Sequence, residues 1–191
     1  QNYDNIEIVV VDGLSNDTTL KILDRYSRFI SVLISESDEG IYDAINKGIR
    51  NCKGELIKIL NSDDKLTECS LEKVLKVYGD NLAGNERDFL IMSTIERISK
   101  TGDKVALWGK FNNVLFFENL LHPSWYVPKT LYQKFGLYSL KYKIASDYEY
   151  FMRLKRANVK LIKSTIPYTK YREGGASADG TGKHEVYEIK K

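Results

Sequence analysis

Cysteine is scarce in this 191-residue sequence, which contains only Cys52 and Cys69. Their spacing fits no metal-binding motif, and two cysteines are too few for the disulfide framework of a small secreted domain. We therefore expect reduced thiols in a cytoplasmic protein. Long apolar runs are also missing: none approaches the ~20 residues that a membrane-spanning helix needs, and no signal peptide is expected.

A large excess of one charge is lacking as well. The formal net charge is +3, which is too small to imply nucleic-acid binding, and no nucleic-acid motif is present. Basic residues are nevertheless concentrated between Lys129 and Arg172, with 11 Lys/Arg and 2 Asp/Glu. This stretch fits either an ordinary solvated surface or peripheral contact with anionic lipid on the inner face of a membrane, or with a diphosphate-bearing acceptor.

Strand-type and helix-type patterns alternate in the first half of the chain. β-Branched runs predict strands at 6–13, 31–36 and 55–64, and apolar residues at helical spacing predict helices at 17–28, 41–49 and 70–78. This order predicts a single α/β domain with a mostly parallel, Rossmann-like sheet that is flanked by helices.

The second half is less regular. Strands are expected on either side of a turn at 101–103, a helix is expected from Pro128 to near Gly136, and two final strands are expected at 159–163 and 166–172. Ser146 and Glu149 have the spacing of a capping box, which predicts a helix from 147 to about 157. Residues 176–191 are expected to be a flexible or partly ordered tail.

Acidic and amide side chains follow two of the predicted strands. Asp12 ends the first strand, and the turn 61–64 (Asn-Ser-Asp-Asp) ends the third. Ligands of such sheets bind at the carboxyl ends of strands, so these residues are expected on one rim. Adjacent carboxylates there suit a hard cation such as Mg²⁺ or Mn²⁺, whereas the alternative is a solvated turn. Asp12 either accepts hydrogen bonds from a ligand or pairs with the next helix N-terminus.

Two candidates come from the second half. Asp147 stands at a predicted helix N-terminus, where a carboxylate either stabilises the helix or stays ionised as a general base. His122 precedes Pro123 in an apolar stretch. It could be a metal ligand or a donor to phosphate, and a packed or capping histidine is the alternative.

Three ordered segments resemble family-two glycosyltransferases of GT-A type. IEIVVVDGLSNDTT resembles the family's strand-and-loop block, SESDEGIYDAINKGIRNCKGELIKILNSDD is similar to its next block, and ASDYEYFMRL resembles its later acidic motif. Together they are far more specific than any one of them. The resemblance covers roughly residues 3–175 and is strongest to bacterial polysaccharide-building transferases. The family's first strand is expected to precede residue 1.

The resemblance implies a GT-A fold, a nucleotide-diphosphate sugar as donor and Mg²⁺ or Mn²⁺ as cofactor. Asp12 would contact the nucleotide base, and Asp38 would lie near the nucleotide. In the acidic turn, Asn61 stands at the position of a ribose contact. Asp63 would coordinate the metal through the diphosphate, with Asp64 beside it. Gly13 stands where the family has a second acid.

The resemblance further implies that Asp147 deprotonates an acceptor hydroxyl, so that the anomeric configuration is inverted. The acceptor would be a glycan or a lipid-diphosphate-linked sugar in cell-surface polysaccharide synthesis. Residues 1–107 would bind the nucleotide sugar, and residues 108–175 would face the acceptor. Two alternatives stay open: a sugar nucleotidyltransferase, and a non-catalytic, receiver-like regulator that uses Asp12.

Overall fold

The computed structural model describes residues 1, 3–84, 86–99, 101–109, 122–172 and 182–191. In chain order the elements are β1 (Val9–Asp12), α1 (Thr19–Arg25), the 3-10 turn η1 (Ser27–Phe29), β2 (Val32–Ser35), α2 (Ile41–Asn51), β3 (Leu56–Ile57), β4 (Lys65–Leu66), α3 (Ser70–Ala83), β5 (Phe89–Ile98), β6 (Lys104–Trp108), the 3-10 turn η2 (His122–Ser124), β7 (Val127–Pro128), α4 (Lys129–Phe135), α5 (Ser146–Arg156), β8 (Lys160–Arg172) and α6 (Gly182–Lys190).

The strands form three small sheets within the described residues. β1 and β2 run parallel, β3 pairs with β7 in antiparallel fashion, and the largest sheet has the order β4-β8-β5-β6. In that sheet the β5–β8 ladder is parallel and is the longest in the described chain, whereas β4–β8 and β5–β6 are antiparallel. The expected sheet is therefore present in a mixed form, with its longest ladder parallel.

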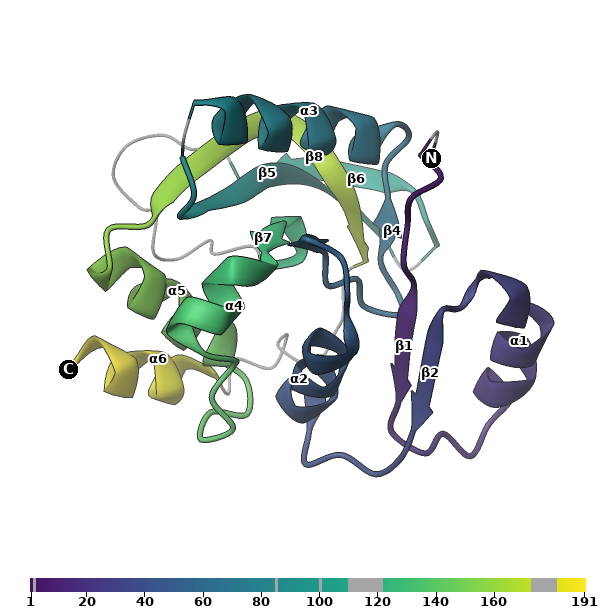
Figure 1. Ribbon diagram of the computed structural model, residues 1–191. Coiled ribbons are helices and arrows are strands. Elements are labelled where there is room, and N and C mark those ends of the chain that lie inside the picture. The colour runs from purple at the N-terminus through teal and green to yellow at the C-terminus, as the bar shows by residue number, and fades with distance from the viewer. Residues whose placement is uncertain (2, 85, 100, 110–121, 173–181) are drawn as a thin grey trace.

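Helices cover both faces of the largest sheet (Figure 1). Successive side chains of β5 point to opposite faces, because strand side chains alternate. Ile91 packs in one buried cluster with Val74 of α3, and Leu90 packs in another with Leu154 of α5. This sandwich of helix, sheet and helix is the main core, and it holds α5 in a fixed position beside the sheet.

The final two predicted strands are one strand, β8, with an irregularity near its middle. The register with β5 shifts between Ser93 and Ile95 of β5, close to Pro167 of β8. Proline has no N–H for a ladder bond, so it is tolerated where pairing is interrupted. At this interruption a side-chain hydrogen bond joins the two strands: the Thr94 hydroxyl donates to the Thr165 carbonyl oxygen at 2.8 Å.

Other local predictions were too long or wrong. Of the predicted strand at 55–64, only Leu56–Ile57 are paired. The capping box does not form: α5 begins at Ser146 with no side-chain cap, and Glu149 instead pairs with Arg153. Of the expected tail, residues 176–181 lie outside the described residues, and Gly182–Lys190 form α6.

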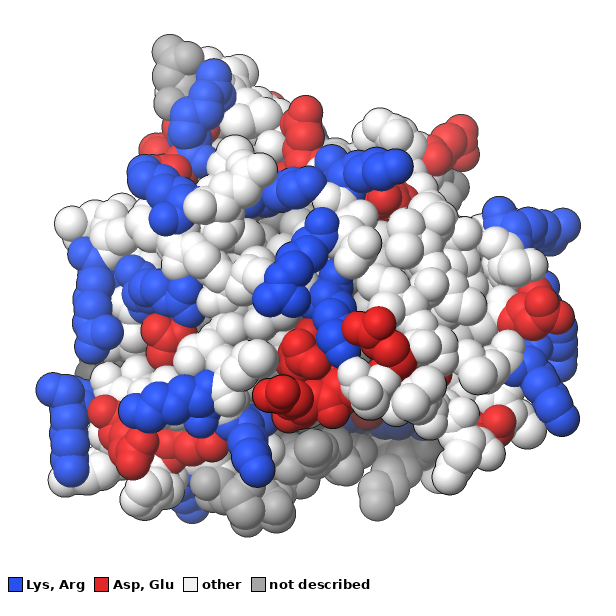
Figure 2. Space-filling view, turned by 60° about the horizontal axis from the view of Figure 1, so that its bottom comes forward, with Lys and Arg blue, Asp and Glu red and all other residues white. Residues whose placement is uncertain are grey.

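None of the helices in the described part of the chain has the length and apolar character needed to cross a bilayer. On the face drawn in Figure 2, acidic side chains gather near the centre, and Lys and Arg side chains are interspersed around them. This face therefore carries both signs of charge.

Candidate active site

Asp12 occupies the carboxyl end of β1 and is buried. Its parallel neighbour is Ser35 of β2, whose hydroxyl donates to Asp12 Oδ2 at 2.8 Å. The backbone N–H of Ser15 donates to the same carboxylate, at 3.2 Å from Oδ2. Hydrogen bonds from Ser15 and Ser35 lower the pKa of the Asp12 carboxyl below its ordinary value, although burial opposes them. Asp12 is thus an ionised acceptor at the sheet edge.

Asp38 lies directly against Gly13, the residue that follows Asp12. A Cβ atom built on Gly13 would be 2.4 Å from Asp38 Oδ2. Asp38 Oδ1 also accepts the Gly40 N–H at 3.0 Å, just before α2 begins. A side chain at Gly13 would therefore displace the exposed carboxylate of Asp38.

The acidic turn contains two aspartates in different environments. Asp64 is buried, and its oxygens accept the Arg172 N–H at 3.1 Å and the Asn61 side-chain amide at 3.2 Å. Burial raises the pKa of the Asp64 carboxyl, and the Arg172 hydrogen bond opposes this rise. Asp63 is exposed, and its carboxylate has no hydrogen-bond or ion-pair partner among the described residues. Asp64 and Asn61 therefore shape the turn, and Asp63 presents a carboxylate that is free of partners in the described part of the chain.

Asp147, near the start of α5, is held by side chains from two other elements. Its Oδ1 accepts the Tyr42 hydroxyl of α2 at 3.0 Å, and its Oδ2 lies 2.9 Å from Nδ1 of His122 in η2. The Tyr148 N–H also donates to Oδ1 at 2.8 Å. Within the described residues, Nε2 of His122 is buried without a partner. The carboxylate is thus fixed in orientation and still partly open to solvent, with a side-chain exposure of 16%.

Lys58 is a charged residue near this site that sequence reasoning did not single out. Its Nζ donates to the carbonyl oxygen of Pro123, next to His122, and lies 5.2 Å from the ring centre of Tyr126. Burial lowers the pKa of the Lys58 ammonium to about 7, and the negative charge of Asp64 opposes this effect. The available signal was a lysine inside an apolar strand pattern, where an ionised group is costly.

Among the predicted residues, His122 and Asp147 are in direct contact, and Tyr42 and Lys58 extend this group to neighbouring elements. Tyr42 stands in the first turn of α2, which follows the Asp38 loop, and reaches Asp147. Asp147 reaches His122, whose neighbour Pro123 accepts a hydrogen bond from Lys58. Tyr42 was missed because its partner is 105 positions away in the sequence. The convergence of α2, η2 and α5 therefore builds the site around Asp147.

The predicted metal site has few protein ligands in the described part of the chain. The described residues contain no group of three or more His, Cys, Asp or Glu side chains that could hold a metal ion. His122 faces Asp147 through Nδ1. Mg²⁺, however, is commonly bound through one or two carboxylates together with substrate phosphates. The free Asp63 carboxylate fits that mode, in which the substrate completes the coordination.

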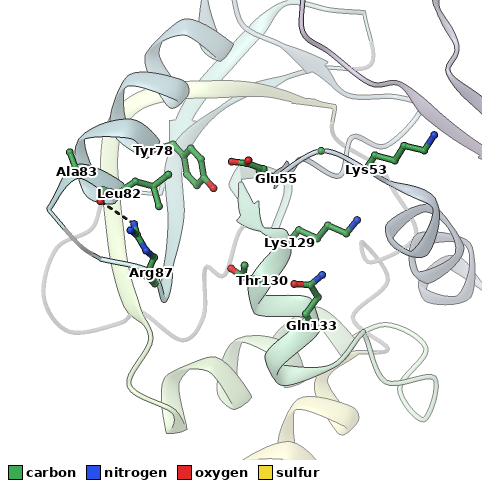
Figure 3. A pocket seen from close by; sticks show the side chains of 10 residues that line it. Lys53, Glu55, Tyr78, Leu82, Ala83, Arg87, Lys129, Thr130 and Gln133 are labelled. Atoms are coloured by element: carbon green, nitrogen blue, oxygen red, sulfur yellow. Dashed lines mark hydrogen bonds between the residues drawn. The ribbon is translucent and has the colours of Figure 1, made fainter.

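A separate pocket of about 720 Å³ lies between α3 and the start of α4. Figure 3 shows Tyr78 and Glu55 pointing toward one another across it, with Arg87 on one side and Lys129 on the other. None of the predicted site residues lines this pocket. It is therefore distinct from the region around Asp147.

Curated relatives of the chain are named as glycosyltransferases. The chain is 27% identical over 162 residues to the PGL/p-HBAD biosynthesis glycosyltransferase of Mycobacterium bovis, covering 80% of this chain and 59% of that protein. It is 27% identical over 171 residues to the glycosyltransferase RP339 of Rickettsia prowazekii, covering 83% and 52%. The chain thus spans little more than half the length of these relatives.

The fold is similar to that of TarS from S. aureus. The chain matches TarS residues 1–349 in complex with UDP-GlcNAc with a TM-score of 0.76, at 17% identity, covering 99% of this chain and 57% of that one. The expected single-domain α/β fold of GT-A type is confirmed by this likeness. The protein-family model described as "Glycosyl transferase family 2" matches residues 1–145 of the chain. The chain therefore belongs to glycosyl transferase family 2.

Proposed function

We propose that this protein is an inverting glycosyltransferase. It moves a sugar from a nucleotide-diphosphate donor to a hydroxyl of a glycan or lipid-diphosphate-linked acceptor in cell-surface polysaccharide synthesis. Family membership and glycosyltransferase relatives support sugar transfer. They also favour it over a nucleotidyltransferase or a receiver-like regulator. The observation that carries the proposal is the orientation of Asp147 by Tyr42 and His122.

Asp147 is the general base of the proposed reaction. It takes the proton of the acceptor hydroxyl, whose oxygen forms the new bond to the anomeric carbon as the bond to the diphosphate oxygen breaks. The electron pair of that bond leaves with the nucleoside diphosphate. The attack is in line, so the configuration inverts and no covalent enzyme intermediate is formed. A positioned base of this kind contributes roughly 10²- to 10⁴-fold to a rate.

The donor is proposed to bind along the edge formed by the first half of the chain. Asp12 contacts the nucleotide base, Asp38 lies beside it, and Asn61 and Asp64 shape the turn under the ribose and diphosphate. Asp63 holds Mg²⁺ or Mn²⁺, which offsets the charge of the departing diphosphate. UDP-GlcNAc in the TarS complex supports a nucleotide-sugar donor.

We further propose that residues 1–107 bind the donor and residues 108–175 face the acceptor. His122 and Asp147 both come from the second segment. His122 acts here through Asp147, and a direct contact with metal or phosphate is the less supported role. The protein is proposed to work in the cytoplasm, in peripheral contact with the inner face of the membrane.

The metal assignment is tested by an Asp63→Ala variant. Calorimetry with UDP and GDP, with and without Mn²⁺, should show metal-dependent binding for the wild type, weakened about 10-fold or more in Asp63→Ala. An Asp80→Asn variant, which removes a carboxylate from the exposed surface of α3, should bind like the wild type. Unchanged metal dependence in Asp63→Ala would remove Asp63 from the metal site.

A further inference from the structure

Helix α6 docks against the segment that leads into α5 (Figure 1). Ile189 of α6 is buried in a cluster with Ala145 and Tyr148. The first residue of α6 also approaches this segment, because a Cβ atom built on Gly182 would be 2.8 Å from Cγ2 of Ile144. The helix is therefore fitted closely beside the chain that carries Asp147.

Glu185 of α6 makes a three-fold contact with this segment. Its Oε1 accepts the Lys143 N–H at 2.9 Å, and its Oε2 accepts the N–H groups of Ile144 at 2.9 Å and Ala145 at 2.8 Å. Burial alone would raise the pKa of the Glu185 carboxyl, but these backbone donors lower it below its ordinary value. Glu185 is thus an ionised acceptor for three consecutive peptide groups.

These three donors lack a local alternative. The residue before α5 is Ala145, which has no polar side chain, and the Ser146 hydroxyl is buried without a hydrogen-bond partner in the described structure. Ala145 is buried, so its N–H would be left without a partner if Glu185 were removed, whereas Lys143 is exposed and its N–H can be met by water. A carboxylate 40 or more positions downstream accepts the N–H groups of the three residues that precede the first helical residue of α5.

The peptide group between Ile144 and Ala145 connects Glu185 to the proposed base. Its N–H, that of Ala145, donates to Glu185 Oε2 at 2.8 Å, while its carbonyl oxygen, that of Ile144, accepts the Tyr42 hydroxyl at 2.7 Å. The same hydroxyl lies 3.0 Å from Asp147 Oδ1. A shift of this peptide would move both the start of α5 and the partner of the Asp147 carboxylate.

We propose that Glu185 is a positioning residue for Asp147, and that α6 is a brace for the catalytic centre. This inference rests on the proposed function, since it gives Asp147 the role of base. Glu185 touches no reacting atom; it fixes the backbone on which Asp147 and its Tyr42 contact depend. Misplacement of a catalytic group by about 1 Å can cost on the order of 100-fold in rate.

Hydrogen exchange tests the brace without any enzyme assay. In Glu185→Ala, and in the isosteric Glu185→Gln, the amides of 143–147 should exchange at least about 10-fold faster than in the wild type. Glu188→Gln is the matched control, because Glu188 lies on the same helix and pairs only at 3.9–4.0 Å with His184 and Lys141. Unchanged exchange in both Glu185 variants would overturn the brace, whatever the enzyme does.

Turnover then tests the positioning role. Glu185→Gln should lower kcat about 10- to 100-fold, with donor KM unchanged, and Glu188→Gln should change neither. In an Asp147→Asn background, Glu185→Gln should have no further effect on kcat, because it acts through Asp147. An additive loss, or a loss confined to KM, would overturn positioning. A wild type with normal exchange protection and no sugar transfer would instead count against the proposed function alone.

Discussion

At the scale of single residues, Gly13 lacks a side chain, and this leaves room for Asp38, which is proposed to lie beside the donor nucleotide. Asp38 Oδ2 occupies the space that a Cβ on Gly13 would need, at 2.4 Å. The sequence displays this residue as a departure from the family pattern. In the structure, the carboxylate of the exposed residue Asp38 lies close to the Gly13 backbone.

Gly13→Ala is expected to weaken donor binding by about 10-fold, or roughly 1.4 kcal/mol, since Asp38 must move away from the position it now occupies. Titration calorimetry with UDP or GDP measures the change. Asp38→Ala in the Gly13→Ala background should add little, because the contact is already lost. Wild-type affinity in Gly13→Ala would show that the position of Asp38 is irrelevant to the nucleotide.

The buried ammonium of Lys58 lowers the stability of the folded protein near the active site. None of the described carboxylates forms an ion pair with it within 4 Å, and burial lowers the pKa of its ammonium to about 7. The ordinary value is 10.5. Between these two values the unfolded chain binds a proton that the folded chain does not, so the contribution of Lys58 to the free energy of unfolding rises with pH.

Lys58→Met is therefore expected to stabilise the protein near pH 7 and below by roughly 1–4 kcal/mol, the range for replacing buried ionic groups with apolar ones. The gain should shrink as the pH rises toward 10. Urea unfolding of both proteins at pH 6, 7, 8.5 and 10 measures this difference. A destabilised variant, or a difference that does not depend on pH, would contradict the depressed pKa.

At the scale of elements, helix periodicity in the first half was a reliable guide. The stripe from 41 to 49 predicted α2 (Ile41–Asn51), and the one from 71 to 78 predicted α3 (Ser70–Ala83). The ends of the strands were harder to predict. The apolar run after Glu55 pairs at only two residues, and Pro167 lies within β8 at a shift in register. Strand length depends on partners far away in the sequence, which a local pattern does not contain.

Gly79 offers a test of helix propensity within α3. It lies inside the helix, and a Cβ built on it meets nothing within 4 Å. Gly79→Ala is therefore expected to raise the free energy of unfolding by about 0.5–1 kcal/mol, because alanine loses less backbone freedom on folding. Denaturant unfolding should show a higher midpoint with the same m-value, and donor affinity should match the wild type. A lower midpoint would mean that the added methyl group is not accommodated.

The same variant serves as a control for the donor edge. Gly79→Ala and Gly13→Ala make identical chemical changes, one in open space and one against Asp38. Weaker donor binding in both variants would point to a general effect of the substitution. Weaker binding in Gly13→Ala alone would locate the effect at the Asp12–Asp38 edge.

At the scale of the whole molecule, the order of motifs predicted the fold class. The rule that ligands bind at the carboxyl ends of strands predicts Asp12 and the acidic turn on one rim, and the roles of these residues stay predictions. It could not predict what holds Asp147, because Tyr42 reaches it from α2 and Glu185 of α6 holds the backbone just before it. Such contacts arise from packing between distant elements. The capping box failed for the same reason: Glu149 pairs with Arg153, and a distant carboxylate satisfies the backbone before α5.

The central claim is that Asp147, held by Tyr42 and His122, removes the acceptor proton during sugar transfer. The most direct measurement compares wild type and Asp147→Asn for donor binding by calorimetry and for transfer under saturating donor. The account predicts donor affinity within about twofold of the wild type and a loss of transfer of about 100-fold or more. Undiminished transfer by Asp147→Asn would contradict it.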